Sequence, residues 1–321
     1  MRKVLVTGLV LVAVGAAAVV WMARPGRDKP NDPPMACHVG IYRLDDGRLV
    51  DIAPMSEPGL RWRAMDGRTG KIVQDAAGKW SGTVGWSDRP DATPVSLGSC
   101  EKPGMTFEGR RGTKLDLEAV ETRFEGNGET LAGRLVMPPG DQPVPIAVMV
   151  HGSEGYSART FNAFQRIFPA QGIGVFVYDK RGSGDSTGRY SQDFHLLADD
   201  AAAALKEARR LAGKRAGRVG FSGGSQAGWI EPLAAQRSDP DFVAVSYGLA
   251  DSPLAEDRDQ VQLDLIRAGF GGDALAKARE VTDATGEVMA SGFKGGYDRL
   301  EALKAKYGKE PWWGAMKGEF T

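Results

Sequence analysis

The chain has 321 residues, of which 42% are apolar and 26% charged, a balance that is ordinary for a globular protein. Its 41 basic and 41 acidic residues cancel to a formal net charge of +0, so bulk charge gives no indication of a nucleic-acid partner. This length allows about two domains.

The N-terminus has the pattern of an export segment. Basic residues at positions 2 and 3 precede an uninterrupted apolar run, residues 4–22, and a polar, proline-rich linker follows. A basic flank before such a run is typical of a secretory signal, and the run is nearly as long as the roughly 20 residues that span a bilayer. We expect residues 1–35 to be a cleaved signal or an uncleaved membrane anchor plus linker; the alternative is a buried core helix.

Residues 36–105 are expected to form a small all-β module. Short strand-like segments alternate there with turn signals, such as Asp-Asp-Gly at 45–47 and Asp-Gly at 66–67. Cys37 and Cys100, the two cysteines of the chain, bracket this region. In an exported protein such a pair predicts a disulfide, and the alternative is two buried free thiols. Because no C-x-x-C or H-x-x-x-H spacing is present, we expect no metal site.

From about residue 106 the pattern is that of an α/β domain. A hairpin is expected over residues 117–140, with its turn near the Gly-Asn-Gly at 126–128. Apolar runs that read as strands then alternate with segments that read as helices, which predicts a parallel sheet covered on both faces. The strands are expected at 144–150, 172–178, 218–223 and 241–248, and the helices at 160–170, 196–213 and 225–236. Residues 253–321 are expected to be helical, with no further strand.

Two serines compete for the position of a nucleophile in the stretch VGFSGGSQAGWIEP, residues 219–232. A nucleophile on a sharp strand-to-helix turn needs a strand before it, a helix after it and small residues on both sides. Ser222 would leave a short strand before it and two glycines at the start of the helix, where glycine is unfavourable. Ser225 has a better strand before it and Ala227 and Gly228 after it. We therefore predict Ser225 as the nucleophile.

Two more loops follow apolar strands: HGSEG at 151–155 and YDKRGSGDS at 178–186. In this order, with VGFSGGSQAGW, the three motifs resemble the α/β-hydrolase family over about residues 106–255. They are most similar to exported bacterial serine esterases of the dienelactone-hydrolase and serine-aminopeptidase-like branch, which often carry an N-terminal β module. Ala227 departs from this resemblance, because glycine is usual at that position.

The resemblance implies a mostly parallel α/β-hydrolase sheet with flanking helices over residues 106–321, with a helical lid at about 253–321. It implies an acyl-enzyme on Ser225, oxyanion donors from the backbone N–H groups of Ser153 and Gln226, and a small-molecule ester as substrate, without a cofactor. Asp251, after the fourth strand, is a weak candidate for the acid. The location implied is the periplasm, with the inner membrane as anchor if residues 4–22 are not cleaved.

The histidine that such a site needs is the difficulty. The family order is serine, acid, histidine, whereas His38, His151 and His195 all precede Ser225. We expect His151 to be structural and His195 to lie on the surface. The sequence is therefore expected to be a C-terminally truncated serine esterase that lacks its last strands and its base. The alternatives are a non-catalytic, membrane-tethered binding module and a serine peptidase for short peptides.

Overall fold

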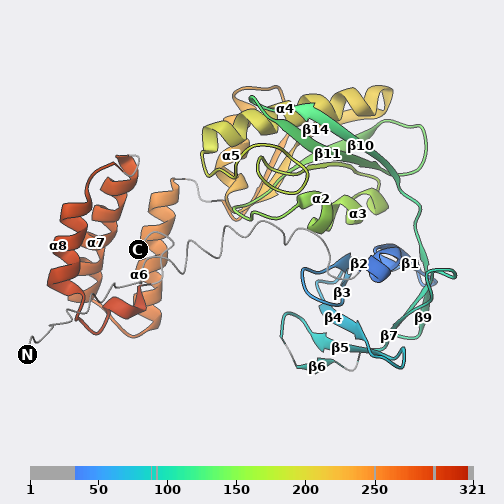
Figure 1. The fold of residues 1–321 in the computed structure, drawn as a ribbon, viewed down its shortest axis with the longest axis horizontal. Coiled ribbons are helices and arrows are strands. Elements are labelled where there is room, and N and C mark those ends of the chain that lie inside the picture. The colour runs from blue at the N-terminus through green and yellow to red at the C-terminus, as the bar shows by residue number, and fades with distance from the viewer. Residues whose placement is uncertain (1–32, 88, 92, 249–250, 292–293, 317–321) are drawn as a thin grey trace, which may run out of the picture. The chain divides into compact units, whose positions relative to one another are not determined.

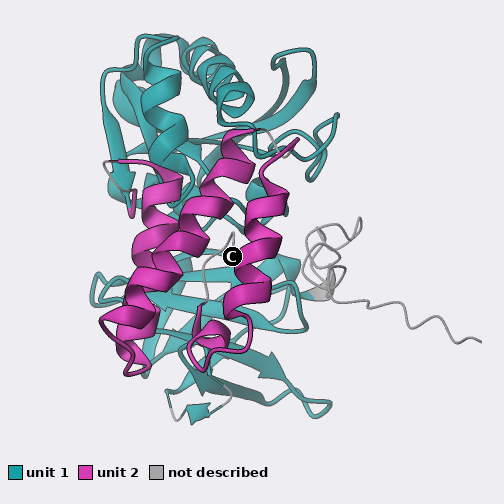
Figure 2. Cartoon of the chain, turned by 90° about the vertical axis from the view of Figure 1, so that its left-hand side faces the viewer, with its two compact units in different colours: residues 1–246 teal, residues 247–321 magenta. Residues whose placement is uncertain are grey.

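The computed structural model describes residues 33–87, 89–91, 93–248, 251–291 and 294–316. The chain divides into two compact units, one ending at Ser246 and the other beginning at Tyr247 (Figure 2). The predicted export segment at residues 4–22 lies outside the described residues. Within the described part, no helix combines the length and the apolar character needed to cross a bilayer.

The first unit begins with a short 3-10 helix, η1 (Pro33–His38), and a nine-stranded antiparallel sheet in the order β6-β5-β4-β3-β2-β1-β9-β8-β7 (Figure 1). The strands are β1 (Gly40–Leu44), β2 (Leu49–Pro54), β3 (Leu60–Ala64), β4 (Thr69–Gln74), β5 (Trp80–Val84), β6 (Pro90–Asp91), β7 (Val95–Leu97), β8 (Met105–Phe107) and β9 (Arg110–Lys114). The turn glycines Gly47 and Gly67 have φ of 88° and 90°, as Asp-Gly turns require.

This β module is larger than the sequence suggested. Strands β8 and β9 belong to its sheet, and β9 pairs with β1, so the module continues to Lys114 rather than ending at residue 105. The indole N–H of Trp80 on β5 donates to the carbonyl of Leu97 on β7 at 3.3 Å. The two ends of the sheet therefore curl toward each other around an apolar core that includes Trp62 and Phe107.

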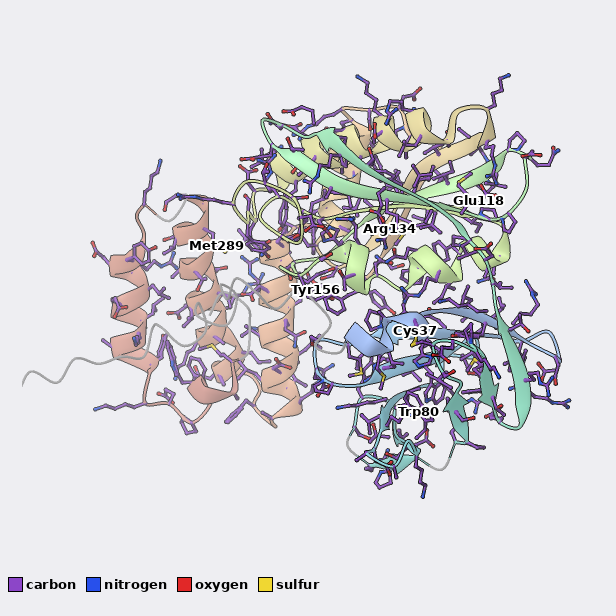
Figure 3. All side chains as sticks on the ribbon, turned by 45° about the vertical axis from the view of Figure 1, so that its right-hand side comes forward. Cys37, Trp80, Glu118, Arg134, Tyr156 and Met289 are labelled. Carbon is purple, nitrogen blue, oxygen red and sulfur yellow. A yellow bond between two sulfur atoms is a disulfide. The ribbon has the colours of Figure 1, made fainter. Side chains whose placement is uncertain are left out.

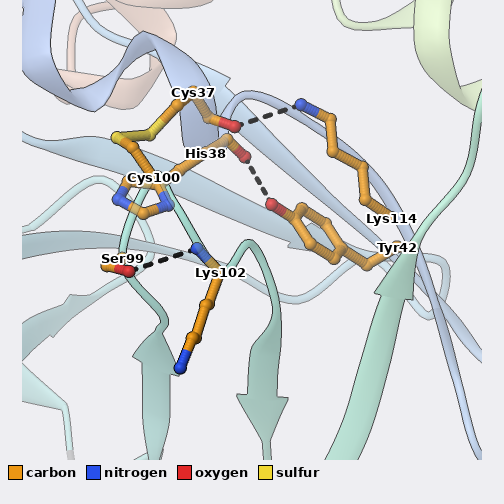
Figure 4. The surroundings of a disulfide bond; sticks show 7 residues. All are labelled: Cys37, His38, Tyr42, Ser99, Cys100, Lys102 and Lys114. Carbon is orange, nitrogen blue, oxygen red and sulfur yellow. Dashed lines mark hydrogen bonds between the residues drawn. A yellow bond between two sulfur atoms is a disulfide. The ribbon is translucent and has the colours of Figure 1, made fainter.

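The predicted disulfide joins Cys37 and Cys100, whose Cα atoms are 5.6 Å apart (Figure 4). It spans 63 residues, a loop long enough for a cross-link to stabilise the module by about 4 kcal/mol in the chain-entropy account. Lys114 on the last strand donates to the carbonyl of Cys37 at 3.1 Å, and Tyr42 donates to that of His38 at 3.0 Å. His38 lies beside the two sulfur atoms, but these are bonded to each other, so they offer a metal no thiolate.

The second sheet has six strands in the order β10-β11-β13-β12-β14-β15 (Figure 1). The predicted hairpin is present as two antiparallel strands, and the four strands after it run parallel to one another, as the apolar runs indicated. The strands are β10 (Glu118–Glu125), β11 (Thr130–Met137), β12 (Val144–Val150), β13 (Gly174–Tyr178), β14 (Ala216–Gly224) and β15 (Val243–Ser246).

Helices cover both faces of this sheet. On one face, α4 (Phe194–Ala212) and α5 (Ala227–Ala235) pack against alternate residues of the central strands, among them Val148, Phe176 and Phe221. The short helix α2 (Ala158–Phe161) packs on the other face against the residues between them, such as Met149 and Val177. This alternation follows from the period of two in a strand, and it confirms the predicted α/β architecture.

The helix expected over residues 160–170 is wrong as a single element. The chain forms α2, then α3 (Phe164–Ile167), then a 3-10 turn, η2 (Pro169–Gln171). Asn162 breaks the path, because its backbone is extended at ψ 115° and its side chain accepts a hydrogen bond from the N–H of Phe164. Asparagine favours such local bonds over a helix interior.

The second unit consists of α6 (Pro253–Arg267), α7 (Asp273–Ala290), α8 (Tyr297–Tyr307) and a 3-10 turn, η4 (Trp313–Ala315). Its own apolar core includes Val261, Val281, Leu303 and Trp312. The prediction that this part of the chain is helical is thus confirmed for its described residues.

Candidate active site

Ser225 lies at the turn between β14 and α5. Strand β14 ends at Gly224 and helix α5 begins at Ala227, so the serine belongs to neither element. Its φ is 57°, in the left-handed region that residues other than glycine rarely adopt, and its side chain is exposed. Ser222 lies within β14 and is half-buried. The backbone therefore distinguishes the two serines in the way that the small-residue pattern predicted.

Close packing around Gly223 explains why the turn needs small residues. A Cβ atom on Gly223 would lie 2.0 Å from the carbonyl oxygen of Val150 on β12 and 2.7 Å from the Cβ of Ala227. The N–H of Ser225 donates to the carbonyl of Ser246, the last residue of β15, at 3.0 Å. The turn is thus fixed between the ends of the strands on either side of β14.

The HGSEG loop at the end of β12 lies against this turn. A Cβ atom on Gly152 would lie 3.6 Å from the Cβ of Ser225 and 2.8 Å from a carboxylate oxygen of Glu154. In the described part of the chain, the backbone N–H groups of Ser153 and Gln226 have no hydrogen-bond acceptor. The two N–H groups that the sequence assigned to an oxyanion hole are therefore unoccupied by protein acceptors.

The loop after β13 surrounds the buried carboxylate of Asp179. Asp179 accepts hydrogen bonds from the hydroxyl of Ser157 at 2.7 Å and from the N–H groups of Arg159 and Asp185, each at 3.1 Å. A Cβ atom on Gly184 would lie 2.2 Å from the same carboxylate. The glycine in this motif thus allows the chain to fold over Asp179, which ties the DKRGSGDS loop to the start of α2.

Lys180, the next residue, is buried and points toward the HGSEG loop, a placement that sequence reasoning missed. Its Nζ donates to the carbonyl oxygen of Gly152 at 2.7 Å. Burial lowers the pKa of Lys180 to about 8, while the nearby carboxylate of Glu154 opposes this shift. No sequence signal separates this lysine from an exposed one, because its burial depends on the packing of two loops.

His151, for which a structural role is expected, lies inside the packed end of the second sheet. It is buried, and its Nε2 lies 2.9 Å from the carbonyl oxygen of Tyr178. Burial, assisted by the charge of Lys180, lowers the pKa of His151 to about 3, so the ring is neutral at physiological pH. Its Nδ1 lies 4.0 Å from Glu154.

The structure brings neither of the other histidines to Ser225. His195 lies in the first turn of α4 and is exposed, as expected, with its ring against Arg237. His38 lies beside the disulfide in the β module. Asp251, the weak candidate for the acid, is an exposed residue of the second unit.

Glu231, on the second turn of α5, is a second residue that sequence reasoning missed. Its side chain is fully buried, and neither carboxylate oxygen has a hydrogen-bond partner among the described residues. Burial raises its pKa to about 8, which leaves the group largely protonated at neutral pH. One of its oxygens lies 2.6 Å from the position of a Cβ on Gly223, directly beneath the turn that carries Ser225.

A cavity of about 260 Å³ adjoins the HGSEG loop. Arg63 on β3 of the β module lines it together with Glu154 and Tyr156, the last of which Figure 3 labels on the side of the second sheet that faces the module. The other lining residues are Ala158, Phe161, Asn162, Ala163, Phe164 and Ile167. Glu154, which also lies beside Gly152, is the residue that the cavity lining shares with the HGSEG loop.

A buried ion pair fixes the β module at this position. Asp51 on β2 is fully buried and accepts a hydrogen bond from Arg166 of α3 at 2.6 Å. Its other oxygen accepts a hydrogen bond from Arg63 at 3.2 Å. The carboxylate of Asp51 thus links the β module to α3 and also positions the guanidinium of Arg63 at the cavity.

Comparisons with known proteins agree with this geometry. Residues 141–246 match the family described as "Serine aminopeptidase, S33". The chain is 32% identical over 94 residues to the quorum-quenching protein AidA of Acinetobacter baumannii, a match that covers 29% of this chain and 31% of that protein. It is also 30% identical over 111 residues to esterase FrsA of an Enterobacter species, a match that covers 34% of this chain and 27% of that protein.

Among solved structures, the chain resembles the dienelactone hydrolase of Anabaena variabilis at 22% identity and a TM-score of 0.33, covering 41% of this chain and 62% of that one. The chain spans about a third of the length of the curated relatives it matches. The family match covers β12 to β15 and all three motif loops. Residues 141–246 are therefore similar to the serine aminopeptidase family, and a curated esterase shares part of its sequence with this chain.

Proposed function

We propose that this protein is a serine hydrolase that cleaves small carboxylic esters, with Ser225 as its nucleophile. The left-handed backbone of Ser225 carries the proposal, because a serine at φ 57° between a strand and a helix is strained, and such strain concentrates at functional sites. Ser225 is also an exposed residue.

In the proposed reaction, the Oγ of Ser225 attacks the carbonyl carbon of the ester and its proton passes to a base. The carbonyl oxygen becomes an oxyanion that accepts hydrogen bonds from the N–H groups of Ser153 and Gln226. The tetrahedral intermediate then expels the alcohol, which takes up the proton, and leaves an acyl group on Ser225. Water hydrolyses this acyl-enzyme in the second half of the reaction.

We further propose that none of the three histidines at positions 38, 151 and 195 is the base. The ring of His151 is buried against Tyr178 and neutral, while His195 is paired with Arg237 on the surface. Loss of a triad member leaves about 10³- to 10⁴-fold acceleration over water, which comes from the oxyanion hole and from binding. Residues 1–321 are therefore expected to acylate slowly and to deacylate more slowly still.

The cavity beside the HGSEG loop is the proposed binding site for one side of the ester. Its volume of about 260 Å³ and its aromatic lining suit a small acyl or alcohol group. Arg63, which also lines the cavity, would favour a substituent with negative charge. The β module would thus contribute to substrate choice.

Hydrolysis of short peptides is the second candidate, which the description of the matching family favours. The observation in its support is the carboxylate of Glu154, which lines the cavity, lies beside Gly152 and would hold the ammonium group of a peptide N-terminus. Aminoacyl p-nitroanilides compared with p-nitrophenyl esters separate the two. A preference for free amino groups that Glu154→Gln removes would favour the peptidase.

We propose that the protein acts outside the cytoplasm. The apolar run at residues 4–22 and the disulfide between Cys37 and Cys100 support this location, because disulfides persist in oxidising compartments. Intact mass of protein purified from periplasm and from cytoplasm, with and without reductant, tests it. Two free thiols in native material would contradict it.

The catalytic proposal is tested by the burst of p-nitrophenolate on mixing with p-nitrophenyl acetate. We expect a burst approaching one equivalent per chain, followed by slow turnover. Ser225→Ala should abolish the burst, and Ser222→Ala, the matched control in the neighbouring strand, should retain it. A burst of equal size in Ser225→Ala would overturn the assignment, and its absence from the unmodified protein would favour a non-catalytic binding role.

A further inference from the structure

Lys180 is a buried cation without a buried counter-ion. The residue is 3% exposed, and no carboxylate of the described residues forms an ion pair with it. Its direct contacts are the carbonyl of Gly152 at 2.7 Å and the ring of Tyr190, whose centroid is 4.8 Å from Nζ. Burying an ammonium with so few partners is unfavourable, so a structural role alone explains it poorly.

The contact with Gly152 determines the direction of the next N–H group. The carbonyl of Gly152 and the N–H of Ser153 belong to one peptide group, and no described peptide bond is cis. In a trans peptide the two groups point in opposite directions. A donor that fixes the carbonyl therefore aims the N–H of Ser153 away from Lys180.

A second contact prevents rotation of the neighbouring peptide. The hydroxyl of Tyr190 donates to the carbonyl of Ser153, and the side chain of Gln192 reaches that hydroxyl in turn. Gln192 also contacts the side chain of Gln226, the residue that follows the nucleophile. Two successive carbonyls of the HGSEG loop are thus held, and the same network reaches the other proposed oxyanion donor.

We propose that Lys180 is a positioning residue for the oxyanion hole: its ammonium group, bonded to the carbonyl of Gly152, orients and polarises the N–H of Ser153. Hydrogen bonds in such a chain strengthen one another, so a cation on the carbonyl makes the N–H of the same peptide a stronger donor. This inference rests on the proposed ester hydrolysis at Ser225 and adds a residue outside the nucleophile, the oxyanion donors and the cavity.

The proposal implies a dependence on pH with a definite sign. Burial lowers the pKa of Lys180 to about 8, so the ammonium is present at neutral pH and is lost above that value. The groups that face it are Glu154, whose carboxylate favours the charged form, the neutral ring of His151 and the ring of Tyr190. The reactivity of Ser225 should therefore fall as pH rises through about 8, although hydroxide alone would raise it.

The first test follows the Ser153 amide by NMR in the full chain labelled with 15N-serine, from pH 6 to 10. We expect its chemical shift to titrate with a midpoint near 8 in the unmodified protein and to stay flat in Lys180→Met. This readout does not depend on catalysis, so it stands or falls separately from the proposed function. A Ser153 amide that does not titrate near pH 8 would overturn the proposal.

The second test is the rate at which Ser225 reacts with a fluorophosphonate. Removing one oxyanion donor lowers the rate of catalysis about 100- to 1,000-fold. In Lys180→Met the N–H of Ser153 is no longer held in its direction, so labelling should be at least about tenfold slower at pH 7. Lys180→Gln keeps a donor without charge and should fall between, while Lys180→Arg should restore most of the rate. Lys206→Met, at an exposed lysine of α4, is the matched control and should label as the unmodified protein does.

The outcomes distinguish the possible roles of Lys180. Unchanged labelling in Lys180→Met would overturn the proposal. A rate that rises through pH 8 and is abolished in Lys180→Arg would make the lysine the base instead, which also overturns it. Labelling that persists in Ser225→Ala would refute the proposed nucleophile. The NMR titration would still test whether Lys180 acts on the Ser153 amide.

Discussion

Substituting Ser225 by glycine should stabilise the protein, although it removes the proposed nucleophile. A residue other than glycine in the left-handed region costs about 1–3 kcal/mol, and Ser225 has φ 57°. Glycine removes this strain but loses about 0.4–1 kcal/mol through the greater freedom of the unfolded chain. The balance is a gain of about 1 kcal/mol.

Ser222→Gly is the matched comparison. Ser222 lies within β14, hydrogen-bonded between β12 and β15, and its φ is not positive. Glycine there relieves no strain and weakens a strand, so a loss of about 1 kcal/mol is expected. The two serine-to-glycine changes, three residues apart, should therefore differ by about 2 kcal/mol in opposite directions.

Urea unfolding followed by far-UV circular dichroism measures this difference. The second unit is the same in both variants and does not contribute to the comparison. We expect the midpoint to rise in Ser225→Gly and to fall in Ser222→Gly, with unchanged slopes. Equal destabilisation by the two substitutions would refute the claim that Ser225 is held under strain.

Three further substitutions test the surroundings of the site. Gly223→Ala places a Cβ 2.0 Å from the carbonyl of Val150, a backbone atom that cannot yield, so we expect a loss of about 3 kcal/mol in thermal unfolding; a neutral result would contradict the packing. Asp51→Asn leaves Arg166 buried without a counter-ion, so we expect the free energy of unfolding to fall by about 3–5 kcal/mol and proteolysis between the two sheets to become faster. A variant as resistant to protease as the unmodified protein would argue against the ion pair as the link between the sheets. Burial raises the pKa of Glu231 to about 8 from an ordinary 4.5, so the folded state binds the proton more tightly and loses stability as pH rises from 4.5 to 8. At pH 8, Glu231→Gln should therefore unfold at a higher urea concentration than the unmodified protein. A difference in stability between the two proteins that stays constant from pH 5 to 8 would refute this.

The sequence allowed the second sheet and the place of Ser225 at a strand-to-helix turn to be predicted because both depend on local patterns. Unbroken apolar runs such as residues 144–150 become buried parallel strands, and only small residues fit beside the turn, as the position of Gly223 shows. The helix expected at 160–170 was wrong because the competing hydrogen bond of Asn162 is a local choice that apolar spacing does not reveal.

The remaining features depend on contacts between distant segments. The β module continues to Lys114 because β9 pairs with β1, about 70 residues earlier in the chain, and hairpin signals do not specify such long-range pairing. Lys180 is buried among loops that include HGSEG, whose Gly152 carbonyl accepts its hydrogen bond. Glu231 left one signal in the sequence, since it is the single charge within the apolar residues 227–235 of α5.

The central claim is that Ser225 is the reactive residue, and locating a fluorophosphonate adduct tests it most directly. Trypsin should release residues 219–237 as one peptide that contains both Ser222 and Ser225, so fragment ions must assign the modified position. We predict a single adduct on Ser225, absent in Ser225→Ala and present in Ser222→Ala. An adduct on Ser222 or elsewhere in the chain, or no adduct in the unmodified protein, would contradict the account.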